Sequence, residues 1–192
     1  MLNKGEVIIF PTDTLYSIAA RYDDVEAIRR IYNIKGRDLK RRLAILCASL
    51  EDIEKIAEVD DRARKLINKY YPGPLTIIMK TKREVMNEFI LSNVGVRIPN
   101  HPLALRILKD NGPLMNSSVN FTNEDPLNEY SDIRREFGDK VDLIFPNYIK
   151  ILNVASTVID MSQGSEIKCI REGAIPFQEI LDTLEEGEKD AD

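Results

Sequence analysis

Five basic residues lie within eight positions of the chain, in the stretch KGRDLKRR from Lys35 to Arg42, which also contains the acidic Asp38. The whole chain has a formal net charge of -5, so this stretch is a local exception. Lys and Arg supply fixed positive charge, and the guanidinium group of Arg can bind phosphate through two parallel hydrogen bonds. The stretch predicts either a solvated basic loop or an anion site suited to the phosphates of a nucleotide.

Neutral hydrogen-bonding side chains gather in a second stretch, PLMNSSVNFTNEDP, after the turn Gly112-Pro113. They are Asn116, Ser117, Ser118, Asn120, Thr122 and Asn123. Such groups suit phosphate oxygens or a ribose, and they are also common in ordinary loops. The stretch is therefore a candidate binding segment, but its spacing alone does not distinguish a nucleotide-binding segment from an ordinary loop.

A third polar group follows a short apolar run, residues 7–10, that we expect to be a buried strand. The loop after it, PTDTLYS, places Thr12, Asp13 and Thr14 at the strand end, where α/β sheets usually bind ligands. These side chains can equally make turn bonds to their own backbone. Arg97 lies inside another predicted strand, residues 94–98, so it is either at a sheet edge or directed at a partner in a cleft.

The composition excludes several classes of protein. The pI near 5.1 argues against binding nucleic acid over a whole face, although a weak local contact with tRNA is compatible with it. Cys47 and Cys169 are flanked by apolar residues, so both are expected in the core, and a structural zinc site is not expected. The only histidine, His101, is expected to cap or pack. Without a signal segment or an apolar run of membrane-spanning length, we expect a cytoplasmic protein with no membrane partner.

Alternating strands and helices must position these groups. Apolar runs predict strands at residues 7–10, 43–48, 75–79, 94–98, 141–145, 156–160 and 168–170, and one that runs into the polar stretch after residue 113. Capping residues predict helices that begin at Asp23 or Asp24, Ser49, Asp60, Asn100 and Pro176, with another near residues 132–137. The simplest architecture is one α/β domain with a mixed sheet. Residues 185–192 carry five acids and one lysine and are expected to form a disordered tail.

Seven short blocks together resemble a known family. They are PTDTLYSIAA, IYNIKGR, PGPLTII, VGVRIPNHPLAL, SSVN, STVID and IREGAI, and they span about residues 5 to 180. In this order they are similar to the YrdC-like family of threonylcarbamoyl-AMP synthases. The resemblance implies a YrdC-like domain over residues 1–184, a twisted, mostly parallel sheet flanked by helices, and a concave basic cavity. It also implies that L-threonine, bicarbonate and ATP give threonylcarbamoyl-AMP and pyrophosphate, for tRNA modification by a downstream threonylcarbamoyl transferase complex.

The resemblance also implies roles for particular residues, because the family pairs a K-x-R motif with an S-x-N motif. The catalytic residues would be Lys35, Arg37, Ser118 and Asn120. ATP would be bound by Lys35, Arg37, Asn120 and Arg171, and threonine by Thr14, Arg97, Ser118 and Ser156. A Mg²⁺ ion would arrive with ATP and be held largely by phosphate oxygens and water, without a dedicated metal site in the protein.

The chain departs from the family pattern at four single positions, which are Ser17, Asp38, Arg42 and Leu46, and its S-x-N motif is followed by Phe121, Thr122 and Asn123 in place of the common Ser-Gly. The family usually has Gly, Pro and Pro at the first three, and many members have His at the fourth. Two interpretations follow. The chain is a threonylcarbamoyl-AMP synthase, or it is a paralogue that keeps the fold and binds nucleotide or RNA without synthase activity.

Overall fold

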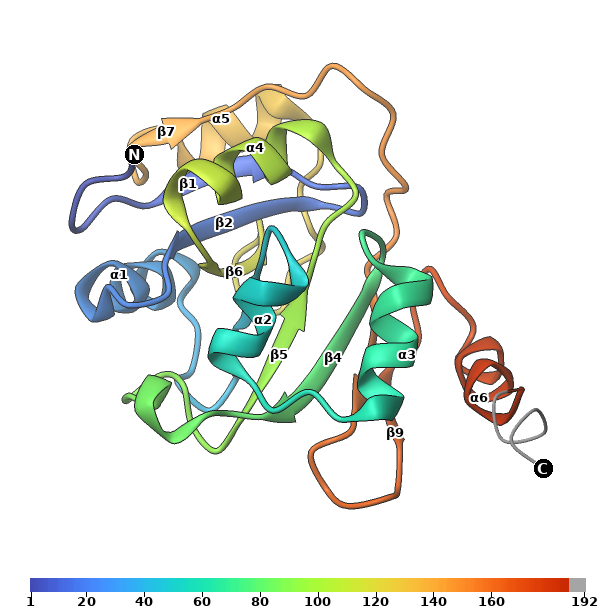
Figure 1. The fold of residues 1–192 in the computed structure, drawn as a ribbon. Helices are drawn as coiled ribbons and strands as arrows, with labels where there is room; N and C mark the ends of the chain where they lie inside the picture. The colour runs from blue at the N-terminus through green and yellow to red at the C-terminus, as the bar shows by residue number, and fades with distance from the viewer. Residues whose placement is uncertain (187–192) are drawn as a thin grey trace.

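The computed structural model describes residues 1–186, and nine strands form a single sheet in the order β7-β1-β2-β6-β3-β5-β4-β8-β9 (Figure 1). The strands are β1 (Ile8–Pro11), β2 (Tyr16–Arg21), β3 (Ala44–Leu46), β4 (Leu75–Lys80), β5 (Asn93–Arg97), β6 (Leu114–Ser118), β7 (Leu143–Ile144), β8 (Thr157–Asp160) and β9 (Lys168–Arg171). The predicted acidic tail lies mostly outside the described residues. Strand β2 was not predicted from the sequence, since its polar ends hide the apolar centre.

The sheet is mixed, as predicted, but the expectation that it is mostly parallel is wrong. Only the pairs β1–β7, β3–β5 and β4–β8 are parallel, and the other five are antiparallel. For two of the antiparallel pairs, β1–β2 and β8–β9, the reason is the length of the connection. Short loops join β1 to β2 and β8 to β9, and a short connection permits only an antiparallel pair.

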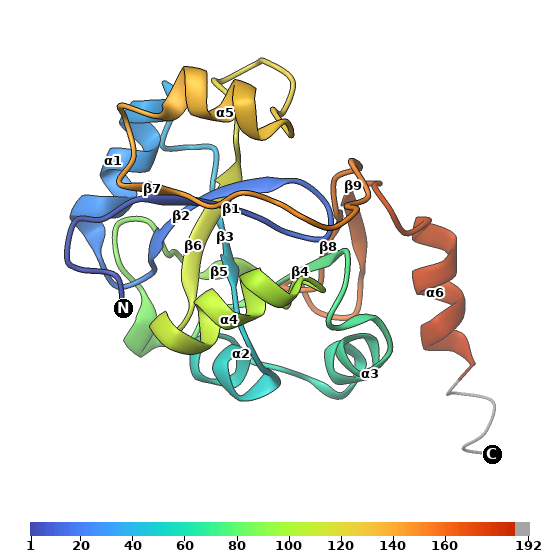
Figure 2. The same ribbon diagram turned by 90° about the horizontal axis from the view of Figure 1, so that it is seen from above.

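Within residues 1–186 there are six helices. They are α1 (Val25–Lys35), α2 (Leu50–Ile56), α3 (Asp61–Tyr70), α4 (Pro102–Asn111), α5 (Tyr130–Phe137) and α6 (Phe177–Glu185), with a 3-10 turn at Arg83–Val85. The last of them packs beside α3 (Figure 1). Helices α4 and α5 lie on opposite sides of β1 and β2 (Figure 2). Residues of β1 alternate accordingly, since Ile9 joins the larger core with Phe137, whereas Ile8 packs in a second core with Leu108 of α4.

Local capping residues explain where the helices begin. The side chains of Asp24, Ser49 and Asp60 accept hydrogen bonds from the third residue that follows, so these predicted starts are confirmed. The predicted start at Asn100 is wrong by one residue. His101 is the cap of α4 and accepts from the Ala104 amide, with Pro102 at the first helical position, so the expectation that His101 caps a helix is confirmed.

The two cysteines differ in their environments. Cys47 is buried in the core, as predicted, whereas Cys169 is exposed, so the expectation of a second core cysteine is wrong. The cause is the position of β9 at the edge of the sheet, where all four of its residues are exposed. Among the described residues, no helix has the length and apolar character needed to cross a membrane.

Candidate active site

A cavity of about 620 Å³ opens on one face of the sheet and gathers most of the polar groups selected from the sequence. Six of the eight predicted site residues line it: Thr14, Arg37, Arg97, Ser118, Ser156 and Arg171. The other two, Lys35 and Asn120, do not line it and lie in contact with Ser118. Segments distant in sequence thus contribute to one cavity.

The floor of the cavity owes its depth to small residues on neighbouring strands. Ala44 of β3 is directly opposite Gly95 of β5, and both line the cavity. A Cβ atom at Gly95 would lie 3.2 Å from the Thr76 methyl group and 3.5 Å from the Ala44 side chain. A larger residue at position 95 would therefore crowd its neighbours and fill the floor.

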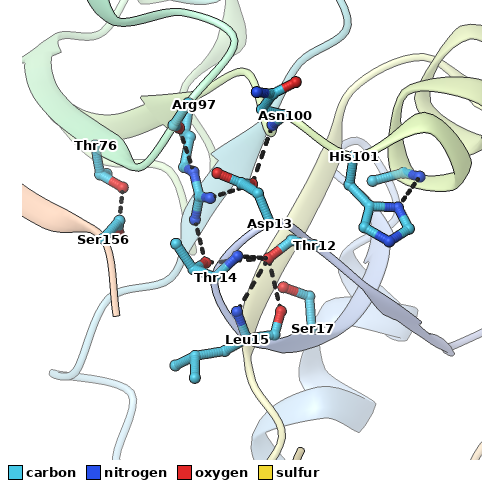
Figure 3. A network of polar contacts seen from close by, with 12 residues as sticks. Thr12, Asp13, Thr14, Leu15, Ser17, Thr76, Arg97, Asn100, His101 and Ser156 are labelled. Atoms are coloured by element: carbon cyan, nitrogen blue, oxygen red, sulfur yellow. Dashed lines mark hydrogen bonds and ion pairs between the residues drawn. The ribbon is translucent and has the colours of Figure 1, made fainter. Parts of the chain in front are cut away.

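Arg97 is held in a buried network at one end of the cavity (Figure 3). Its side chain donates from Nε to the Gly73 carbonyl at 2.9 Å, from Nη1 to Thr14 Oγ1 at 2.8 Å and from Nη2 to Asp13 Oδ1 at 2.5 Å. Only 5% of Arg97 is exposed, and β5 lies inside the sheet, so Arg97 is directed at partners and is not at an edge. Burial lowers the pKa of Arg97, and the adjacent Asp13 carboxylate opposes that shift.

The loop after β1 is arranged by the same network. Asp13 Oδ1 also accepts from the Asn100 amide at 3.0 Å, and Thr12 Oγ1 donates to the Leu15 carbonyl at 2.6 Å. Thr12 therefore makes a turn bond, which was the simpler of its two interpretations. Thr14 is different, because its hydroxyl is fixed by Arg97 and it lines the cavity.

Ser156 and Arg171 are coupled at the nearby wall, where β8 and β9 form a hairpin. The Ser156 hydroxyl lies 2.9 Å from Thr76 Oγ1 (Figure 3). Arg171 donates to the Ser156 carbonyl from Nε at 3.2 Å and from Nη2 at 2.8 Å. Burial lowers the pKa of Arg171. These bonds hold its guanidinium at the cavity, where it adds positive charge.

Lys35 joins the two family motifs, but it does so behind the cavity wall. Its Nζ donates to the Ser118 carbonyl at 2.5 Å, to the Asn120 carbonyl at 2.6 Å and to Asn120 Oδ1 at 3.0 Å. Only 1% of Lys35 is exposed, and burial, with a further contribution from the Arg37 charge, lowers its pKa to about 7. The ammonium group thus fixes the backbone at residues 118–120, and Ser118 Oγ donates to the same Asn120 Oδ1 at 2.7 Å.

The basic stretch folds back over the cavity. Helix α1 ends at Lys35, and Gly36 has a left-handed φ of 58°, which reverses the chain direction at the helix end. Arg37, Lys40 and Arg42 then line the cavity, whereas Arg41 does not. These three residues lie where the anion-site interpretation requires them, and Lys40 and Arg42 are also exposed to solvent.

The guanidinium of Arg37 is only partly available. It donates from Nε to the Arg41 carbonyl at 2.8 Å and from Nη2 to the Arg42 carbonyl at 3.2 Å, while Nη1 makes no bond to the described residues. Burial lowers the pKa of Arg37. Arg42 reaches across and donates to Asn93 Oδ1 of β5. The loop therefore has a defined shape and leaves the Nη1 donors free.

Of the four departures from the family pattern, Ser17, Arg42 and Leu46 line the cavity, and Asp38 does not. Asp38 Oδ1 accepts from the Lys40 amide at 2.8 Å and shapes the loop. Thr76, Asn93 and Asp160 also line the cavity, and none of them was predicted from the sequence as a site residue. Strand alternation would have indicated Asn93, because it lies two residues before Gly95 and four before Arg97 on one face of β5.

The cavity has little capacity to bind a metal ion directly. Within residues 1–186 no group of three or more His, Cys, Asp or Glu side chains could hold one, and Asp160 is the one acidic residue of the cavity lining. A divalent cation here would need most of its oxygen ligands from a substrate and from water.

Comparison with known proteins identifies relatives of the whole fold. The family model Sua5_yciO_yrdC, described as "Telomere recombination", matches residues 1–173. A Methanocaldococcus jannaschii relative, whose name contains threonylcarbamoyl-AMP synthase, is 36% identical over 179 residues, covering 92% of this chain and 84% of that protein.

Two solved structures are also similar. The crystal structure of Pyrococcus abyssi Sua5 complexed with L-threonine matches with a TM-score of 0.87 and 30% identity, over 93% of this chain and 54% of that chain. The crystal structure of Escherichia coli YciO matches with a TM-score of 0.81 and 26% identity, over 91% of this chain and 86% of that chain. This chain thus spans about half the length of the P. abyssi protein.

Proposed function

Because the chain belongs to the Sua5/YciO/YrdC family, we propose that it forms threonylcarbamoyl-AMP and pyrophosphate from L-threonine, bicarbonate and ATP. The observation that carries the proposal is the cavity itself, on which Thr14, Arg37, Arg97, Ser156 and Arg171 converge from separate parts of the chain. The family assignment agrees with the resemblance found in the sequence motifs. The activity, the substrates and the partners are the proposed part.

We assign L-threonine to the end of the cavity formed by Thr14, Arg97 and Ser156. The related P. abyssi Sua5 structure is a complex with L-threonine. At this end the charge of Arg97 is balanced by Asp13, the Thr14 hydroxyl accepts from Arg97, and the Ser156 hydroxyl is paired with that of Thr76. A nearly neutral set of oriented donors and acceptors suits a small zwitterion that has a hydroxyl group of its own.

ATP would occupy the more basic part. Arg37, Lys40 and Arg42 on one side and Arg171 on the other can neutralise the triphosphate. The free Nη1 of Arg37 is placed to donate to a phosphate oxygen. We expect Lys35 and Asn120 to act indirectly, because their bonds hold Ser118 in its position at the cavity wall. The Mg²⁺ that accompanies ATP would be bound mainly by phosphate oxygens, with Asp160 as the protein carboxylate within the cavity lining.

The reaction needs no nucleophile from the protein. The ammonium group of threonine first releases a proton. The resulting amine attacks the carbon of bicarbonate, and loss of water leaves a carbamate. A carbamate oxygen then attacks the α-phosphorus of ATP, the bond from that phosphorus to the bridging oxygen breaks, and pyrophosphate leaves. The protein contributes by holding the reactants together and by balancing negative charge on the phosphates.

We further propose that the product serves tRNA modification in the cytoplasm, through a downstream threonylcarbamoyl transferase complex. A direct contact of this chain with tRNA would be weak, because the chain has a net charge of -5 and its dense basic stretch, Lys35 to Arg42, is only eight residues long. Transfer of the product to a separate protein is compatible with that weak contact.

A second function is supported by specific observations. The E. coli relative of known structure is YciO, described as an uncharacterized protein, and it is of similar length to this chain. In addition, Arg37 uses two of its nitrogens on its own loop, and Arg42 donates to Asn93 of β5. Such a closed loop would also suit a protein that binds nucleotide or RNA without synthase activity.

One incubation separates the two functions. The chain is mixed with ATP, L-threonine, bicarbonate and MgCl₂, and pyrophosphate and threonylcarbamoyl-AMP are measured while each reactant is omitted in turn. The proposal expects both products only when all three reactants are present. Equal pyrophosphate release from ATP alone would indicate a nucleotide hydrolase, and binding of ATP without turnover would favour the binding protein.

A further inference from the structure

We propose that Asn116, oriented by Ser17, selects adenine over 6-oxo purines at the floor of the cavity. The inference rests on the proposed function, because it requires that a purine nucleotide occupies this cavity. It assigns the base to a bed formed by Ala44 and Gly95 and gives Asn116 a role in specificity.

The sheet register places these residues in one row. Asn116 of β6 is opposite Ala44 of β3, Ala44 is opposite Gly95 of β5, and Gly95 is opposite Ile78 of β4. Residues paired in this way point to the same face of a sheet, and all four line the cavity. Three strand spacings, or about 14 Å, separate the backbones at the two ends of the row.

The middle of this row is a flat bed. Between Asn116 and Ile78 the two intervening positions have only a methyl group and a hydrogen atom as side chains. A planar purine ring can lie on the two small residues with one edge toward Asn116. The Gly95 position is already close-packed from the side, since a Cβ atom there would approach Thr76 to 3.2 Å.

The polar groups of Asn116 are only half used. Its Nδ2 donates to Ser17 Oγ at 3.1 Å, and Ser17 is only 5% exposed. Asn116 Oδ1 makes no hydrogen bond to the described residues. An acceptor and the second Nδ2 hydrogen are therefore presented to the cavity.

This arrangement distinguishes purines at position 6. Adenine has an amino group at C6 and an acceptor at N7, and an Asn side chain pairs with both, by Oδ1 to the amino group and by Nδ2 to N7. A 6-oxo purine would instead place its O6 acceptor against Asn116 Oδ1, which leaves two acceptors facing each other. Ser17 accepts the Nδ2 hydrogen that adenine would not use, which leaves Oδ1 and the other Nδ2 hydrogen for the base.

The test compares two nucleotides that differ at this position. Titration calorimetry measures the affinity of the full chain for ATP and for inosine triphosphate, each with MgCl₂ and without threonine. We expect the wild-type chain to bind ATP at least about fivefold more tightly, the lower end of the discrimination provided by one Asn–adenine pair. Asn116→Ala should lower this ratio to about one, mainly by weakening ATP binding, and Ser17→Ala should lower it partly.

Two controls make the result interpretable. Asn33→Ala removes an exposed Asn of α1 and should leave the ratio unchanged. Thermal unfolding of Asn116→Ala should match that of the wild-type chain, so that lost selectivity is not lost folding. An unchanged ratio in Asn116→Ala, or equal binding of both nucleotides by the wild-type chain, would overturn the inference.

The inference and the proposed function fail separately. If the wild-type chain prefers ATP through Asn116 but releases no pyrophosphate with threonine and bicarbonate, the inference stands and the synthase activity is refuted. If pyrophosphate is released but Asn116→Ala keeps the preference for ATP, the activity stands and the role of Asn116 is refuted.

Discussion

Replacement of Lys35 by Met tests how the buried ammonium group connects the two family motifs. Met has a similar length and no charge, so Lys35→Met removes the three bonds from Nζ to Ser118 and Asn120 with little change of volume. The oxygen acceptors that lose their donor are buried or partly buried, and each unsatisfied one destabilises the fold by roughly 1–3 kcal/mol. Lys35→Met also removes the cost of burying the ammonium charge, and this gain offsets part of the lost stability.

The pH dependence of the free energy of unfolding shows whether Lys35 is charged or neutral in the folded chain. Burial lowers the pKa of Lys35 from 10.5 to about 7, so between these pH values the folded chain binds fewer protons at this site than the unfolded chain. The free energy of unfolding of the wild-type chain must then rise with pH relative to that of Lys35→Met. The greatest slope for one proton is about 1.4 kcal/mol per pH unit.

Urea unfolding of both chains at several pH values from 7 to 10 measures this difference, with Lys4→Met, at an exposed lysine, as the control. We expect the gap between the wild-type chain and Lys35→Met to widen steadily with pH, and that between the wild-type chain and Lys4→Met to stay constant. Parallel curves for the wild-type chain and Lys35→Met would refute the reasoning. They would mean that the three oxygen acceptors keep Lys35 protonated throughout this range.

Four other predictions follow from the same contacts. Arg37→Lys keeps the charge but loses the guanidinium fork, so the rate of pyrophosphate release should fall more than about tenfold, or about 1.4 kcal/mol of transition-state binding. Arg41→Lys, at a residue outside the cavity, should keep a rate near that of the wild-type chain. Equal effects of the two substitutions would contradict the assignment of Arg37 to the phosphates. Arg97→Met leaves Asp13 buried without its charge partner, so urea unfolding should show a loss of roughly 3–5 kcal/mol, and a loss below 1 kcal/mol would contradict the buried pair. Gel-shift titrations should detect weak tRNA binding that disappears at moderate salt; tight binding that persists in high salt would oppose the picture of one local basic loop. Deletion of residues 187–192, which have no apolar face, should leave activity and Tm unchanged, and a Tm lower by several degrees would show that this segment packs on the fold.

The sequence alone determined most of the local structure. Asp24, Ser49 and Asp60 cap helices because each is a few residues from the amide it binds, and such bonds depend on neighbouring positions only. Apolar runs marked most of the strands for a similar reason. The blocks that resemble the YrdC-like family also led to the correct family, because the order and spacing of motifs can be compared in the sequence without knowledge of the fold.

Only the tertiary structure decided the use of the polar residues. From the sequence, Lys35 and Arg37 are two similar cations, yet Lys35 is buried against Ser118 and Asn120, while Arg37 lines the cavity. Likewise, Asp13 is 84 positions from Arg97 and still binds it. The order and register of strands that are far apart in the chain decide which cation is buried and which one lines the cavity. Residue type and local spacing do not predict that pairing of strands.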